Sequence, residues 1–136
     1  MKPERVFAGY LLIQGIGGVA FWVLLTSVGP VREAIELLPA EHAVTDSFVF
    51  ADLFVGILGS WLGAYALLRG RRWAVPMVAF TAGGLVYPTF FLLGWLLFTG
   101  TGAVCLGIML LPSLMSSWVA AQTWKLFRTG FADIAS

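Results

Sequence analysis

The sequence predicts an all-α integral membrane protein built as a four-helix bundle, and three observations lead to this fold class. The 136 residues are 60% hydrophobic and only 11% charged, whereas charged residues make up about a quarter of an ordinary soluble domain. The hydrophobic residues gather in four long runs that hold almost no charge. Each run is long enough to cross a hydrocarbon core of about 30 Å as a helix, which rises about 1.5 Å per residue. We therefore expect one transmembrane domain over residues 1–136.

The four spans are expected at about residues 6–28, 48–68, 73–98 and 103–123. The first follows a short charged leader. It is too long for the apolar core of a secretory signal peptide, and no small-residue cleavage site follows it. The second span holds a single acidic or basic residue, Asp52. The third and fourth contain Pro88 and Pro112, which helices in a membrane tolerate.

A short amphipathic helix is expected between the first two spans. Residues 31–38 place apolar side chains at positions 31, 34, 35 and 38, which is helical spacing. Pro30 suits the first turn of such a helix, and Pro39 follows its expected end. We expect this helix to lie on the membrane surface.

The distribution of Lys and Arg sets the expected orientation, because loops on the cytoplasmic side carry the excess of these residues. Of the eight Lys and Arg residues, all but Arg32 belong to the leader, the turn between the second and third spans, or the tail: Lys2, Arg5, Arg69, Arg71, Arg72, Lys125 and Arg128. Both termini should therefore face the cytoplasm, and residues 31–38 should lie on the opposite side.

The sequence lacks the residues that several kinds of functional site need. The chain has one cysteine, Cys105, and one histidine, His42, so we expect no metal site. We also expect no cofactor, because Gly15-x-Gly-Gly18 lies inside a span and is not a nucleotide motif. A net charge of +1 without a basic patch gives no indication of nucleic acid binding.

Small and polar residues within the spans predict how the helices pack. Helices in lipid approach closely where small residues recur four positions apart, as in the pairs Gly59/Gly63, Ala79/Gly83 and Ser113/Ser117. We expect these pairs to pack within the bundle rather than across a dimer interface. A deeper polar layer is expected to form hydrogen bonds between helices: Gln14, Thr81, Ser113 and Ser117.

Asp52 is the leading candidate for a functional residue, since an acid inside a span is costly to bury and should face the bundle or water. Two interpretations stay open. In one, Asp52 is hydrated at the membrane interface, near a helix N-terminus that favours its charge. In the other it lines an outer-half pocket with Tyr87 and Thr89, which lie at a similar depth. Trp22, inside the first span, either faces lipid or forms a wall of that cavity.

Part of the second span resembles a known group of membrane proteins. The matching features are Ser-Phe-Val-Phe-Ala-Asp-Leu at residues 47–53, Tyr-Ala-Leu-Leu-Arg-Gly at residues 65–70, then Trp73 and Pro76. This stretch resembles the second helix and following turn of the EXPERA group, the emopamil-binding and sigma-2-receptor-like proteins. The resemblance implies that Asp52 lines a pocket for sterols or amphipathic amines. The chain is also similar in length and span number to small bacterial DoxX-like proteins, and we expect it in a bacterial plasma membrane.

The function expected from these observations is non-enzymatic. The chain would bind a lipid or an apolar or amphipathic small molecule near Asp52, or act as an accessory subunit of a membrane complex. One alternative is a small proton-coupled transporter working as a homodimer, which needs an ionisable group near mid-membrane. Another is a lipid or sterol isomerase, which needs a second acid or a base near Asp52. His42 is the only candidate for that base.

Overall fold

The computed structural model describes residues 2–37 and 42–132. Its helices are α1 (Pro3–Ser27), α2 (Gly29–Ile35), α3 (His42–Ala51), the π-helix η1 (Asp52–Leu58), α4 (Gly59–Leu68), α5 (Ala74–Thr99) and α6 (Ala103–Ala132). The elements α3, η1 and α4 follow one another without a break and form one long helix. Four stretches are long and apolar enough to cross a membrane: Pro3–Ser27, Thr45–Leu68, Ala74–Thr99 and Ala103–Arg128. The predicted all-α fold with four apolar helices is therefore confirmed.

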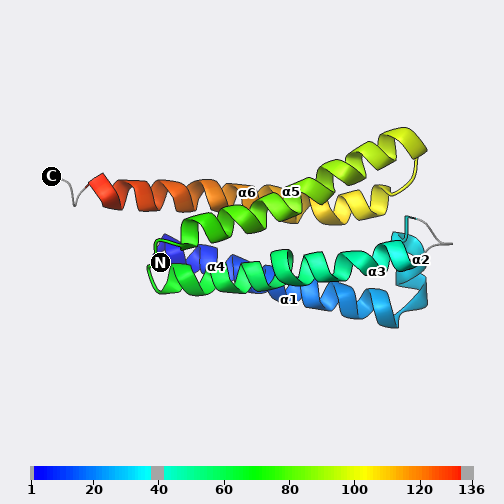
Figure 1. Cartoon of the computed structure of the whole chain (residues 1–136), viewed down its shortest axis with the longest axis horizontal. Coiled ribbons are helices and arrows are strands. Elements are labelled where there is room, and N and C mark those ends of the chain that lie inside the picture. Colours follow the sequence, from blue (N-terminus) through cyan, green and yellow to red (C-terminus); the bar gives the residue numbers. More distant parts are fainter. Residues whose placement is uncertain (1, 38–41, 133–136) are drawn as a thin grey trace.

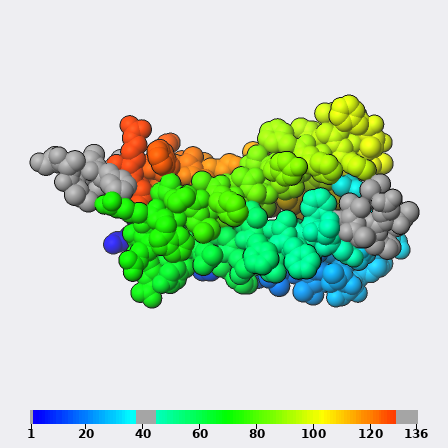
Figure 2. Space-filling view, in the orientation of Figure 1, coloured from blue at the N-terminus to red at the C-terminus, as the bar shows by residue number. Residues whose placement is uncertain are grey.

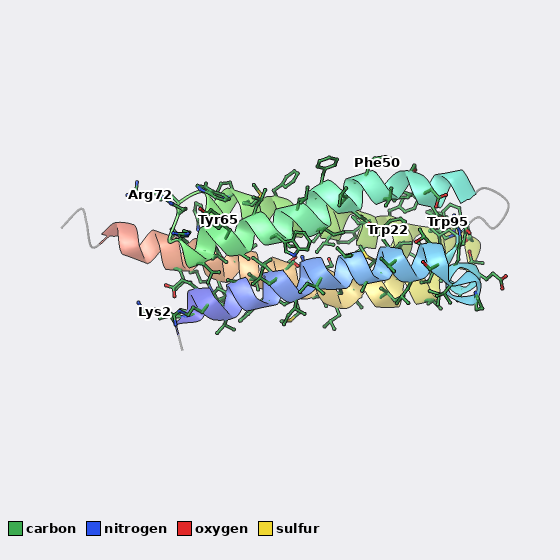
Figure 3. The ribbon with its side chains drawn as sticks, turned by 90° about the horizontal axis from the view of Figure 1, so that it is seen from below. Lys2, Trp22, Phe50, Tyr65, Arg72 and Trp95 are labelled. Atoms are coloured by element: carbon green, nitrogen blue, oxygen red, sulfur yellow. The ribbon has the colours of Figure 1, made fainter. Side chains whose placement is uncertain are left out.

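The long helices form two antiparallel pairs, α1 with α3–η1–α4 and α5 with α6 (Figure 1). The start of α1, the α4–α5 turn and the end of α6 lie together, and we call this the terminal end. The opposite end carries α2 and the α5–α6 turn, and we call it the α2 end. Lys2 and Arg72 lie at the terminal end and Trp95 lies towards the α2 end (Figure 3). The basic residues Lys2 and Arg72 thus share one end of the bundle, as the sequence predicts.

The two turns at opposite ends both depend on glycine. Gly70, after α4, has a φ of 59°, and Gly100, after α5, has a φ of 72°. These left-handed conformations are easily reached only without a Cβ. The Gly100 N–H donates to the Leu96 carbonyl and so closes the last turn of α5, as glycine often does at helix ends.

The terminal half of the bundle is densely filled. Its core holds Leu11 from α1, Ala64 from α4, Val78 from α5 and Val119 from α6, each at most 1% exposed. Gly63 lets these helices meet, because a Cβ there would lie 3.2 Å from Val78 and 3.3 Å from Leu11. The same close approach occurs at Gly59, where a Cβ would lie 2.5 Å from the Thr81 hydroxyl.

The small-residue pairs of the second and third spans thus differ in whether they pack within the bundle. Gly59 and Gly63 pack within the bundle, as expected. Ala79 and Gly83 are exposed on the outer face of α5, and a Cβ on Gly83 would meet nothing within 4 Å. The expectation for this pair is wrong, because α5 presents Val78 and Ala82 rather than Ala79 and Gly83 to its neighbours.

A short helix does connect the first two spans, although it starts and ends earlier than expected. It covers Gly29–Ile35, with Pro30 in its first turn, and Glu36 already has extended backbone angles. Residues 38 and 39 lie outside the described ranges. Arg32 pairs with Glu36 at 3.1 Å and with Asp46 at 2.8 Å, which joins α2 to α3. The hydrogen bond to Glu36, with the Asp46 carboxylate beside it, raises the pKa of Arg32.

The π-helix η1 is a feature that the sequence analysis did not predict. Hydrogen bonds from residue i to i+5 widen its turns, and such segments are rare and often occur at functional sites. Asp52 is the first residue of η1. The widened turn places residues four and five positions apart above one another, so Asp52, Gly56 and Ile57 share one face.

Candidate functional site: two cavities beside Asp52

Asp52 points into the bundle and is held by a tryptophan from another span. The indole N–H of Trp22 on α1 donates to Oδ2 of Asp52 at 3.1 Å. Trp22 is 8% exposed, and Figure 3 shows it near the α2 end of the bundle. The second carboxylate oxygen, Oδ1, accepts no hydrogen bond from the described residues. Among the described residues, Asp52 therefore keeps one oxygen free beside its bond to Trp22.

A smaller cavity lies between Asp52 and the α2 end. Its volume is about 160 Å³, and we call it the outer cavity. Aromatic and aliphatic side chains make up most of its wall, among them Phe21, Phe48, Phe91, Leu92, Trp95 and Ile108. Cys105 also lines it and donates through its thiol to the Ile35 carbonyl at 2.8 Å. This bond ties α6 to the end of α2 beside the cavity.

A larger cavity extends from the same two residues towards the terminal end. Its volume is about 530 Å³, and we call it the inner cavity. Both cavities share Phe21, Trp22, Asp52, Ile108 and Met109 in their walls. The Trp22–Asp52 pair therefore stands at the junction of two apolar spaces.

Glycine residues, which have no side chain, account for part of the open volume of the inner cavity. Gly17 on α1 and Gly56 in η1 both line the inner cavity. A Cβ built on either residue would meet nothing within 4 Å. These glycines therefore face open space, unlike Gly63, which faces a neighbouring helix.

Proline adds to the opening at the α2 end. Pro88 lines the outer cavity and removes the helical hydrogen bond to the Gly84 carbonyl, which is a common cause of bending. Figure 1 shows α5 curving away from α3 in this region. The space-filling view shows the two helix pairs meeting near the terminal end and separating towards the α2 end (Figure 2).

A hydrogen-bonded layer closes the inner cavity towards the terminal end. Gln14 donates to Ser60 on α4 at 2.8 Å and accepts from Ser116 on α6 at 2.6 Å. The Tyr10 hydroxyl bonds Ser116 at 3.0 Å and the Pro112 carbonyl at 3.1 Å. Of the expected polar layer, Gln14 does join three helices. Its partners Ser60 and Ser116, and Tyr10, which bonds Ser116, were not predicted from the sequence.

The structure brings together two of the four candidate site residues. Trp22 and Asp52 are hydrogen bonded and line both cavities. Tyr87 is 74% exposed. Thr89 is 8% exposed, and its hydroxyl donates to the carbonyls of Leu85 and Met109. Neither Tyr87 nor Thr89 is among the described residues of the cavity walls, so the structure does not place them in one pocket with Asp52.

The positions of Tyr87 and Thr89 differ from the prediction for a geometric reason. Successive residues of an α-helix turn by about 100°, so equal depth in the membrane does not mean equal direction. Pro88, between Tyr87 and Thr89, is the residue of that trio that faces the outer cavity. Phe21, Ile108 and Met109 belong to both walls, but as ordinary apolar residues of a span they carry no signal in the sequence.

No family model, curated protein or solved structure matches the chain. The likeness to the EXPERA group and to DoxX-like proteins therefore stays a proposal. The geometry of the cavities carries the functional argument.

Proposed function

We propose that this chain is a non-enzymatic integral membrane protein that binds an amphipathic ligand beside Asp52. The observation that carries the proposal is a carboxylate with one free oxygen at the junction of two apolar cavities. Apolar walls with a few polar groups that fix orientation are typical of small-molecule sites. The combination suits a ligand with a hydrocarbon part and one polar group.

Charge complementarity favours a positively charged polar group. Among the described residues that line the two cavities there is no Lys, Arg or His to pair with Asp52. An ammonium group can donate a charge-assisted hydrogen bond to Oδ1 while Trp22 keeps Oδ2. The proposed ligand class is therefore a cationic amphiphile such as a lipid-like amine, in line with the amines that the EXPERA resemblance implies.

The membrane arrangement that goes with this proposal places both termini in the cytoplasm of a bacterium. The support is the concentration of Lys and Arg at the terminal end, including Lys2 and Arg72 (Figure 3). The α2 end then faces outwards, with α2 at the membrane surface. Asp52 and the outer cavity lie in the outer half of the membrane.

The experiment compares amphiphiles that differ only in charge. Isothermal titration calorimetry in a nonionic detergent measures binding of dodecylamine and of dodecanoic acid, with protein-free micelles as the blank. We expect the wild type to prefer the amine. Asp52→Asn should weaken amine binding roughly tenfold, which corresponds to about 1.4 kcal/mol, because the amide keeps the shape and the bond to Trp22 but loses the charge.

The matched control is Glu33→Gln, which removes an exposed carboxylate from α2 and leaves the cavities intact. This variant should bind dodecylamine as the wild type does. Equal binding by the Asp52→Asn variant and the wild type, or no binding by either, would remove the ligand proposal. The accessory-subunit interpretation would then take its place.

A further inference from the structure

The inner cavity has a polar group at each end and hydrocarbon between them. Asp52 and Trp22 stand at one end, and Tyr10 and Gln14 line the other. Along α1, the eight residues from Gln14 to Trp22 correspond to about 12 Å at about 1.5 Å per residue. The wall between them is apolar and includes Ile13, Ile57, Leu85, Ile108, Met109, Leu111 and Met115.

The far end of this cavity is held in place by hydrogen bonds from three helices. Gln14 on α1 is bonded to Ser60 on α4 and to Ser116 on α6, while Tyr10 is bonded to the Pro112 carbonyl. An apolar group that moved beyond this layer would separate polar groups that have no other partner in lipid. This hydrogen-bonded layer therefore closes the inner cavity at its far end, and we call it the floor of the cavity.

The side of the cavity reaches the surface that faces the bilayer. Ile13, Leu111 and Met115 line the cavity and are 70%, 68% and 37% exposed, respectively. They belong to α1 and α6, which pack against each other far less closely than α1 packs against α4 or α5 against α6. In a membrane, this seam between α1 and α6 opens towards lipid tails.

We propose that the inner cavity takes a single alkyl chain of the cationic amphiphile, and that the Tyr10–Gln14–Ser116 layer limits the length of that chain. This inference rests on the proposed function, since the ammonium group at Asp52 fixes where the chain begins. Carbon–carbon bonds of about 1.5 Å in a zigzag advance by about 1.25 Å each, so 12 Å accommodates about ten carbons. The chain reaches the cavity sideways, through the seam between α1 and α6.

The test uses a series of primary alkylamines from hexylamine to hexadecylamine, titrated into the wild-type protein. Affinity should rise about threefold to fourfold for each added methylene, the effect of burying one such group. The rise should stop near decylamine, where the chain meets the floor. A steady rise through hexadecylamine would overturn the inference.

A pair of glycine variants on α1 provides the second measurement. Gly17→Leu places a side chain in the inner cavity and should weaken decylamine binding at least tenfold. Gly9→Leu is the matched control, because Gly9 also faces open space but does not line the cavity. Thermal unfolding should show that both variants fold.

The outcomes separate the two proposals. Equal decylamine affinities in the Gly17→Leu and Gly9→Leu variants would overturn the chain-length inference, and the loss in Asp52→Asn would still support the amine site. Failure of every alkylamine to bind the wild type would remove the proposed function and the inference with it.

Discussion

The same four apolar helices run through both halves of this bundle, but the two halves are packed differently. In the terminal half, Leu11, Ala64 and Val78 are at most 1% exposed and fill the space between three helices. In the α2 half, Trp22, Leu25 and Ile57 form a smaller buried group, and both cavities adjoin it. The difference lies in which small residues face a neighbouring helix and which face open space.

Two glycines of one continuous helix make the contrast concrete. Gly63 in α4 lies against Val78 and Leu11, whereas Gly56 in η1 borders the inner cavity with nothing near its missing Cβ. The first brings helices together and the second leaves room between them. The same residue type thus supports packing in one half and a binding space in the other.

The largest expected effect comes from truncating the filled core. Leu11→Ala should lower the free energy of unfolding by about 3 kcal/mol, since large-to-small changes in a tight core leave a cavity. The matched change Leu85→Ala, in the wall of the inner cavity, should cost less than half as much because the space beside it is already open. Unfolding of detergent-solubilised protein by sodium dodecyl sulfate measures both. Equal losses would show that the two halves are packed alike.

An intermediate effect is expected from filling the glycine positions. Gly63→Val should destabilise the fold by about 2 kcal/mol, because the added side chain forces α4 away from Val78 and Leu11. Gly56→Val should change stability by about 0.5 kcal/mol or less, the size of an ordinary helix-propensity difference. Thermal unfolding followed by circular dichroism distinguishes them. A larger loss for Gly56→Val than for Gly63→Val would contradict the comparison.

The smallest effect concerns the polar layer between the two halves. Gln14→Leu removes the hydrogen bonds to Ser60 and Ser116 and should cost about 1 kcal/mol, the usual size of such contacts between membrane helices. Gln122→Leu serves as the control, since Gln122 is half-buried and belongs to neither the layer nor the cavity walls. Denaturant titration of both variants checks this. If Gln122→Leu costs as much as Gln14→Leu, the layer contributes nothing specific.

Much of the fold could be predicted because lipid leaves few alternatives. A backbone in hydrocarbon must satisfy its own hydrogen bonds, so long uncharged runs have to be helices. An acid inside a span is costly to bury in lipid, and this correctly predicted that Asp52 faces the bundle. The sequence could not indicate that Trp22 among six tryptophans would be its partner, since their contact joins residues thirty positions apart. Nor could depth alone reveal that Tyr87 faces outwards, because α5 takes its rotation from the helices packed against it.

The π-helix has a consequence for how one span serves both halves. In an uninterrupted α-helix, Asp52 and Gly63 are eleven residues apart, which is about three full turns, and both would point at the same neighbour. Because a wide turn uses one more residue for the same rotation, residues after it point about 100° away from where an unbroken α-helix would place them. The segment therefore changes the direction in which one span presents its side chains: Gly63 lies between Val78 on α5 and Leu11 on α1, while Asp52 faces Trp22 on α1 and borders both cavities. Deleting one residue from η1 would convert the wide turn into an ordinary α-turn without rotating Asp52 relative to Gly63, so the wide turn is how this span accommodates one residue more than a regular helix.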